Sequence, residues 1–239
     1  YLAAPLTSNY YNGTAKDLNG IMVIDRIFQN PETKRQIRDE LGLSDTDMDG
    51  SYLDFNYDMN YEPGFLIGFQ LYFGLTKKAW LLADINFVQL KASSVITLNV
   101  PDPNLPDNSV IQLPVFGKEE RFIIDLAAHF ILGKGTIKGY FEFGGNFLSA
   151  KVKENKFEVG DLIYDLLPTS NNIAANTITS FTFGGLVGGG IFIKASNNIA
   201  LEAGLQIGYN NVKLPEYEGY KPNFLISLRF ILFGKDSGV

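Results

Sequence analysis

The chain has one histidine, His129, which stands close in sequence to two carboxylates, Asp125 and Glu142. A histidine beside a carboxylate is an arrangement that general acid–base catalysis uses, so His129 is the first residue to weigh as a catalytic base. The chain has no cysteine and no second histidine, so Ser-His-acid and Cys-His centres elsewhere would lack their base. Any such chemistry therefore depends on where the surrounding segments place His129.

The segments around His129 alternate apolar and polar residues with a period of two. Residues 122–132 and 137–148 are joined by a short glycine-containing turn, and each carries a continuous apolar face. Side chains alternate sides along a strand, so these segments predict a β-hairpin with Asp125 and His129 on its polar face. The pattern suits a closed barrel with lipid outside and a polar interior. It returns at residues 65–73, 81–88, 181–193, 201–207 and 224–232.

The ionisable residues on the polar faces would fill the interior of such a barrel. An eight-stranded barrel is just wide enough for its own side chains, and an unpaired charge there costs several kcal/mol. We predict a self-neutralising network centred on Arg229; the alternative is a polar path for protons or small solutes. His129 would point inward near a periplasmic turn, which argues against catalysis. The predicted network comprises Asp84, Asp125, His129, Lys138, Glu142, Lys194, Glu202 and Arg229.

The connections between these segments alternate in length. Three are tight, around Lys77, Lys134 and Asn197, whereas those between them are long. Short periplasmic turns and long extracellular loops are typical of bacterial outer-membrane barrels, so we expect that location. The long loops are predicted at Val100–Pro114, at Lys153–Asn176 with a helical turn at Asp161–Leu167, and at Leu214–Lys221.

Composition narrows the class further. No run of about 18 apolar residues is present, which excludes a transmembrane helix on length. The net charge of −6 argues against nucleic acid as a partner. No signal peptide begins at Tyr1, and we interpret the sequence as a mature or trimmed chain. We therefore expect an all-β protein, one domain over residues 1–239, forming a transmembrane antiparallel up-and-down barrel of eight strands.

Residues 9–60 differ from the main barrel strands at 61–233 and predict a helical, acidic insertion in the first long loop. Asn30-Pro31-Glu32 is a typical helix start and Gly42 a typical helix end, so one or two short helices are expected. The eighth strand has two candidate positions. Residues 1–8 would leave the insertion in an extracellular loop, whereas residues 52–59 would leave it on the other side of the membrane.

The insertion also contains half of a calcium-loop motif. Carboxylates at alternating positions precede Gly50, as they do in an EF-hand. The place of the bidentate glutamate is taken by Asn56, so a neighbouring acid would have to substitute. One hypothesis is a Ca²⁺ site that stabilises the loop, and the other is a solvated acidic turn; no cofactor is otherwise required. The candidate ligands are Asp45, Asp47, Asp49, Ser51 and Asp54.

A glycine-rich stretch, residues 184–190, lies within the predicted strand at 181–193. No lysine follows it at P-loop spacing, so it is not a nucleotide-binding loop. Strand glycines allow a neighbouring backbone to approach closely, which suggests a docking stripe for another membrane protein. The alternative is that the glycines ease the curvature of the barrel. The stripe would comprise Phe181, Phe183, Gly185, Val187 and Gly189.

The chain has a family resemblance that rests on four stretches. They are 62–68 (EPGFLIG), 141–147 (FEFGGNF), 200–209 (ALEAGLQIGY) and 224–230 (FLISLRF). From about Tyr61 onward it resembles the small outer-membrane β-barrel family of Bacteroidota, which includes PorT-like and OmpA-like eight-stranded barrels. The resemblance implies protein secretion or outer-membrane biogenesis as the setting. We expect a non-enzymatic structural or accessory subunit of a larger envelope complex, with outer-membrane lipid and other outer-membrane or lipoprotein subunits as partners. The alternatives are a small passive pore or solute-binding barrel, and a lipid-modifying enzyme.

Overall fold

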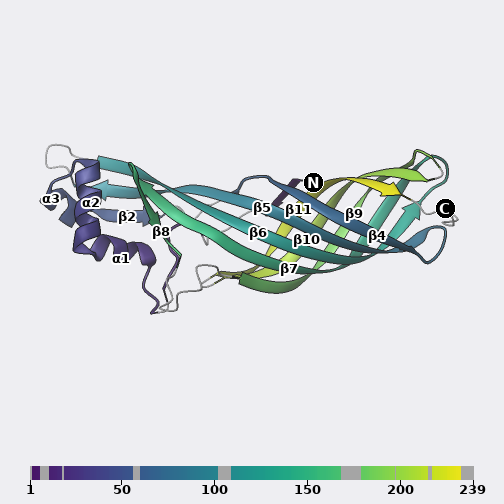
Figure 1. Cartoon of the computed structure of the whole chain (residues 1–239), viewed down its shortest axis with the longest axis horizontal. Helices are drawn as coiled ribbons and strands as arrows, with labels where there is room; N and C mark the ends of the chain where they lie inside the picture. Colours follow the sequence, from purple (N-terminus) through teal and green to yellow (C-terminus); the bar gives the residue numbers. More distant parts are fainter. Residues whose placement is uncertain are drawn as a thin grey trace.

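A computed structural model describes residues 2–5, 11–17, 19–55, 60–101, 109–167, 179–196, 198–214 and 217–232. In these residues the chain is predominantly antiparallel β-sheet with short helices at one end (Figure 1), as the expected all-β class requires. None of the described helices is long and apolar enough to cross a membrane. The strands are β1 (Leu2–Pro5), β2 (Tyr52–Phe55), β3 (Asn60–Tyr61), β4 (Gly64–Gly74), β5 (Ala79–Val100), β6 (Ser109–Leu132), β7 (Ile137–Val159), β8 (Leu162–Asp165), β9 (Thr179–Lys194), β10 (Ile199–Leu214) and β11 (Tyr217–Leu232). The helices are α1 (Val23–Gln29), α2 (Pro31–Leu41) and α3 (Asp45–Gly50).

The sheet order is β2-β5-β4-β1-β11-β10-β9-β7-β6, and β6 pairs in addition with β5. The short strand β1 lies between β11 and β4, where Leu2 is opposite both Ile226 and Phe65. Of the two positions expected for the opening strand, the structure therefore uses the first. The rival segment supplies β2, which pairs with β5, and residues 56–59 of that segment lie outside the described residues.

The tight turns gather at the end of the sheet opposite the helices (Figure 1). They connect β4 to β5, β6 to β7 and β9 to β10, which confirms the predicted positions of the tight connections. Asn197 itself lies outside the described residues. We call the part of the sheet between these turns and the level of Val88, Arg121 and Ala150 the turn half. The rest, namely residues 89–100, 109–120 and 151–159 with β2 and β8, is the projecting half.

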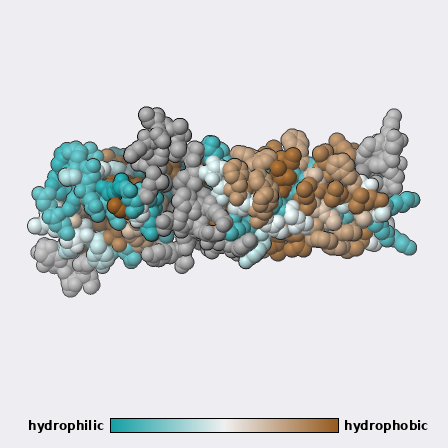
Figure 2. Space-filling model, turned by 90° about the horizontal axis from the view of Figure 1, so that it is seen from below, coloured by the Kyte–Doolittle hydropathy of each residue, from teal (hydrophilic) through white to brown (hydrophobic). Residues whose placement is uncertain are grey.

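In the turn half the outer face is apolar and the inner face carries the charges. Phe65 is 84% exposed, Phe69 82% and Phe230 76%, whereas Asp125 and Arg229 are buried. Figure 2 shows the apolar surface concentrated at this end of the molecule. The predicted division of odd and even positions between the two faces is therefore present here.

In the projecting half the pattern is reversed. Leu98, Leu113 and Phe157 are fully buried on the inner face, against the helices, while Lys91 and Lys153 are exposed on the outer face. With 24 residues, β6 is about 80 Å long at about 3.3 Å per residue, so it extends well beyond the turn half. β5 likewise extends beyond the turn half and ends at Val100.

The helix α2 begins and ends at the capping residues that the sequence provides. The side chain of Asn30 accepts hydrogen bonds from the backbone N–H groups of Glu32 and Thr33, Pro31 opens α2, and Gly42 ends it with φ of 67°. Ile24, Ile37 and Met48 anchor the three helices in the core of the projecting half. Burial of this face, more than helix propensity, stabilises such short helices.

Part of the predicted loop Val100–Pro114 belongs to a strand, because β6 already begins at Ser109. Pro114 faces Val95 of β5, but pairing with β7 begins only at Val115. Proline has no N–H to donate, and Pro114 lies where β6 has a neighbour on one side only. A proline alone is therefore a poor signal for a loop at the edge of a sheet.

The other two loop predictions also need correction. Instead of a helical turn at Asp161–Leu167, the chain forms a tight hairpin in which β8 pairs with the end of β7. Gly160 takes a φ of 56° at the turn, and the Tyr164 ring stacks on Phe157 with centroids 5.0 Å apart. The predicted loop Leu214–Lys221 is likewise mostly strand, because β10 and β11 remain paired up to Leu214 and Tyr217.

Candidate functional site

The inner face of the turn half holds a network centred on Arg229. Its guanidinium group, on β11, donates to both carboxylate oxygens of Glu142 on β7, at 3.0 and 3.1 Å. It also lies 3.5 Å from Oε2 of Glu202 on β10. A bidentate arginine–carboxylate pair is among the strongest hydrogen-bonded pairs, and burial raises the cost of breaking it. The predicted centre of the network is therefore observed.

His129 lies between the two glutamates. Its Nδ1 is 3.1 Å from Glu142 Oε2 and its Nε2 is 3.2 Å from Glu202 Oε1. The imidazole is stacked between Trp80 and Tyr140, with centroids 5.5 and 4.8 Å away, and is fully buried. A substrate could not reach the imidazole without displacing one of these rings.

Glutamine side chains connect the network to two buried aspartates. Gln70 on β4 donates to Asp84 at 2.9 Å, and Gln206 on β10 donates to Asp125 at 3.2 Å. Tyr72 donates to Glu202 at 2.9 Å and joins β4 to the centre. Asp84 and Asp125 are opposite each other on β5 and β6, so each acid is met by an amide rather than by a cation.

Two residues predicted for the network lie apart from it. Lys138 and Lys194 are partly exposed near the tight turns, and the Lys138 ammonium lies 5.6 Å from the centroid of the Phe192 ring. Long lysine side chains can extend towards water, so an inward position near the end of a strand does not fix their charge in the interior. The remaining six predicted residues are all buried.

Glycines make room for the network. A Cβ on Gly204 would lie 1.8 Å from the Tyr140 hydroxyl, and one on Gly188 would lie 2.9 Å from Glu142 Oε1. Both positions face the interior, so part of the glycine-rich sequence of β9 and β10 is needed for packing. Neither curvature nor docking alone accounts for it.

A second buried cluster, which the sequence interpretation missed, lies where the two halves meet. The hydroxyls of Tyr11 and Tyr61 donate to Glu119 Oε2, at 3.0 and 2.6 Å, and Arg121 Nε donates to Glu119 Oε1. Arg121 also donates to Asn223 at 2.9 Å. Glu119 and Arg121 have the same parity as Asp125 and would have been found if the strand had been extended before Phe122. Tyr11 had no such signal, because it reaches the interior from outside the sheet.

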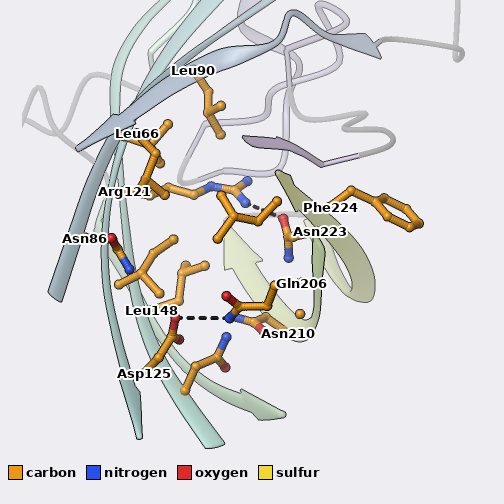
Figure 3. Close-up of a pocket in the computed structure, with 15 residues that line it drawn as sticks. Leu66, Asn86, Leu90, Arg121, Asp125, Leu148, Gln206, Asn210, Asn223 and Phe224 are labelled. Atoms are coloured by element: carbon orange, nitrogen blue, oxygen red, sulfur yellow. Dashed lines mark hydrogen bonds between the residues drawn. The ribbon is translucent and has the colours of Figure 1, made fainter. Parts of the chain in front are cut away.

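A cavity of about 50 Å³ lies between this cluster and the Arg229 network. Asp125, Gln206 and Asn210 lie on one side of it and Leu66 and Leu90 on another, and Arg121 extends between them towards Asn223 (Figure 3). At about 10–15 Å³ for each water, the cavity has room for a few water molecules. It is too small for a solute of metabolite size.

The calcium-loop motif does not form a loop. Residues 45–50 are helix α3, in which Asp47 accepts from the Ser44 N–H and hydroxyl and caps the helix. Asp45 pairs with Arg38, and Asp49 pairs with Lys34 at 2.5 Å. Ser51 donates to the Met48 carbonyl, and Asp54 is exposed on β2. The carboxylates thus have separate partners, and no group of three or more metal-binding side chains occurs in the described part of the chain.

The proposed docking stripe does lie on one outer surface. Phe181, Phe183 and Val187 are 64%, 76% and 53% exposed, and Gly185 faces the same side. Gly189 is partly covered, and a Cβ there would approach the Tyr140 carbonyl oxygen within 2.9 Å. The five residues share a face, and they remain a hypothesis for docking.

The arrangement as a whole is a sheet with a buried, charged inner network at one end and a helix-covered apolar core at the other. The comparisons add no relative from which a role could be transferred. The chain matches no family model, no curated protein and no solved structure.

Proposed function

We propose that this chain is an integral outer-membrane β-barrel of eight strands that acts, without catalysing a reaction, as a structural or accessory subunit of a larger envelope complex. The observation that carries the proposal is the turn half, with apolar side chains outside and charges inside. In water this arrangement would carry two free-energy costs. Exposed apolar surface costs about 25 cal/mol per Å², and the buried charges lose their hydration. In lipid the outer face is favourable.

The strand pairing supports closure of the sheet. β1 has β11 and β4 as neighbours, and β5 has both β4 and β6. The pairings therefore run through eight strands and lead back to the first of them, in the order β5, β4, β1, β11, β10, β9, β7, β6 and again β5. On β4 the outer apolar residues extend from Phe65 to Phe73, about 26 Å along a strand. A tilt of about 40° reduces this to about 20 Å, close to the apolar band of about 25 Å in such barrels.

The filled interior favours a structural role over a passive pore. The Arg229 network spans the interior from β4 to β11, and the cluster at Tyr11 lies above it. Between them is only a cavity of about 50 Å³ among the described residues. We expect the purified protein to give no steady single-channel conductance in planar bilayers, whereas stepwise conductance would favour the pore.

The projecting half supports the accessory role. A barrel needs no long sheet with three packed helices to be anchored in a membrane, so this ordered surface is available to partner proteins. The enclosure of His129 supports the absence of catalysis. Together with the resemblance to small Bacteroidota barrels, this suggests protein secretion or outer-membrane biogenesis, and a gentle-detergent pull-down with mass spectrometry would identify the partners.

Two arginine substitutions on one strand test the membrane proposal. Leu126 is 58% exposed in the turn half and Val110 is 60% exposed in the projecting half, both on β6. For a soluble protein the two substitutions would be equally mild. In a membrane barrel, Leu126→Arg places a charge against hydrocarbon and should cost about 2–4 kcal/mol, whereas Val110→Arg should cost little.

The measurement is urea unfolding of the full chain folded into phosphatidylcholine vesicles. A large loss for Leu126→Arg together with none for Val110→Arg supports the proposal. Equal effects would contradict it, as would a wild-type chain that stays monomeric in buffer without detergent.

A further inference from the structure

A group of lysines lies on the outer face of the sheet, next to the apolar surface of the turn half and on its side away from the tight turns. Phe87 and Phe122 are opposite each other on the outer faces of β5 and β6. Two residues further from the turns, Gln89 is opposite Glu120, and beyond them Lys91 is opposite Lys118. On β7 the same outer levels carry further lysines, because Lys151 is opposite Glu120. We call Lys91, Lys118, Lys151 and Lys153 the basic patch.

The basic patch lies at headgroup depth if the turn half is in lipid, so this inference rests on the proposed function. Phe87 and Lys91 are about 13 Å apart along β5, or about 10 Å along the membrane normal for a tilt of about 40°. The polar layer beyond the hydrocarbon core is about 5–8 Å thick on each side. Lysine side chains extend along the apolar surface and hold their ammonium groups in that layer.

Only part of the patch is neutralised by the protein. Lys153 lies 3.2 Å from Glu120, and Lys118 lies 3.8 Å from Glu154. Glu154 is shared, because Lys156 lies 3.1 Å from it. Lys91 and Lys151 form no ion pair with a described residue.

Lys91 lies where lysines outnumber acidic residues. Its register partner is Lys118 on the same outer face, and like charges directly opposite each other destabilise a sheet. The chain as a whole carries a charge of −6, so a local excess of cations is not a general property of its surface. Glu62 lies beside Lys91 at the same level, because its backbone N–H donates to the Lys91 carbonyl, and one level further out lies Lys156. These five lysines exceed Glu62, Glu120 and Glu154 by two positive charges.

We infer that the basic patch binds the phosphate groups of the lipids that surround the barrel, in the leaflet from which the projecting half emerges. Lysine is a point-charge donor well suited to phosphate, and the patch borders the lipid-facing surface without interruption. An acidic protein segment would need no such proximity to the apolar surface. The interaction would fix how deeply the barrel sits and on which side the projecting half lies.

The test compares the double variant Lys91→Gln/Lys151→Gln with a matched control, Lys77→Gln/Lys134→Gln, in the tight turns at the other end. Each full chain is purified in a non-ionic detergent, and binding of phosphatidylglycerol is counted by native mass spectrometry. Loss of two lysines near a membrane surface should weaken binding about 25-fold, at about fivefold for each lysine. The control should bind like the wild-type chain.

Four outcomes would overturn the inference. Equal phosphatidylglycerol binding by both double variants would show that the patch is not the lipid site, while vesicle insertion of the wild-type chain would leave the proposed function intact. If inorganic phosphate binds the wild-type chain as well as phosphatidylglycerol does and displaces it, the patch is a free-phosphate site. If the Lys91→Gln/Lys151→Gln variant loses binding of polyglutamate but keeps binding of phosphatidylglycerol, the occupant is an acidic polypeptide. Failure of the wild-type chain to enter phosphatidylcholine vesicles would instead remove the proposed function and this inference together.

Discussion

The two halves of β5 and β6 bury opposite kinds of side chain without a break in the alternation between them. On β7 the alternation shifts by one residue at the boundary, because Glu119 is opposite Val152 whereas Lys118 is opposite Glu154. On β6 the inner face carries Asp125 and His129 in the turn half but Leu113 and Val115 in the projecting half. On the outer face the opposite holds, because the turn half carries the apolar Leu126 and the projecting half carries the charged Lys118. An uninterrupted strand can therefore change what it buries without changing which way its side chains point, and the surroundings of each half decide which pattern is favourable.

A separate cluster of side chains lies at the boundary where the buried face changes from charged to apolar. Glu119 and Arg121 lie at the boundary and are closed in by Tyr11 and Tyr61. The Tyr11 ring fits there because residue 117 is glycine, where a Cβ would lie 2.0 Å from the ring. The segment before the helices thus seals the polar interior from the apolar core, which keeps the two kinds of burial separate.

The largest effect should come from breaking the interior network in the turn half. Arg229→Leu leaves Glu142 and Glu202 buried without their guanidinium partner, and we expect a loss of about 3–5 kcal/mol in urea unfolding of the vesicle-folded chain. Arg38→Leu, at an exposed pair with Asp45 near the helices, should cost less than about 1 kcal/mol. If Arg229→Leu alone prevents folding, adding Glu142→Gln should restore part of the stability. Unchanged stability of the single variant would contradict the network.

An intermediate effect should come from the core of the projecting half. Leu98 is fully buried against the helices, and Leu98→Ala should cost about 3 kcal/mol through lost contacts and a cavity. The loss should appear as faster hydrogen exchange in α1–α3, while insertion of the turn half into vesicles stays unchanged. The matched control is Leu126→Ala, which shortens an exposed side chain on the outer face of the turn half and should leave exchange in the helices unaffected. Loss of vesicle insertion with Leu98→Ala would mean that the two halves fold as one unit.

Periodicity made much of the turn half predictable from the sequence. Alternation determines which residues share a face, so the outer position of Leu126 and the inner positions of Glu142 and Arg229 followed from parity alone. The ends of strands were harder to predict. Pro114 and the acidic, polar residues beyond Lys153 are typical of loops. They are tolerated in strands here because Pro114, Glu154 and Glu158 lie on the outer, accessible face of the sheet.

The parts that sequence did not reveal depend on contacts between distant segments. Tyr11 reaches Glu119 across more than a hundred residues of sequence, and no local pattern marks that pairing. The alternating acids at Asp45 and Asp47 fit two local structures, a calcium loop and a capped helix start. The helix was selected by Ser44 and by burial of Met48, neither of which belongs to the calcium motif.

The smallest effect should be a pH dependence confined to the helices of the projecting half. The Ser44 hydroxyl and backbone N–H donate to Asp47 and lower the pKa of its carboxyl group from the ordinary 3.8. A lowered pKa means that the ionised form stabilises the fold; this contribution is present above the ordinary pKa and is lost as pH falls through the lower folded value. The thermal midpoint should therefore differ between the wild-type chain and Asp47→Asn at pH 7, and the two should converge below pH 3.8. Asp54→Asn, at an exposed position on β2, should show no difference at either pH, and a gap for Asp47→Asn that persists in acid would contradict the capping role.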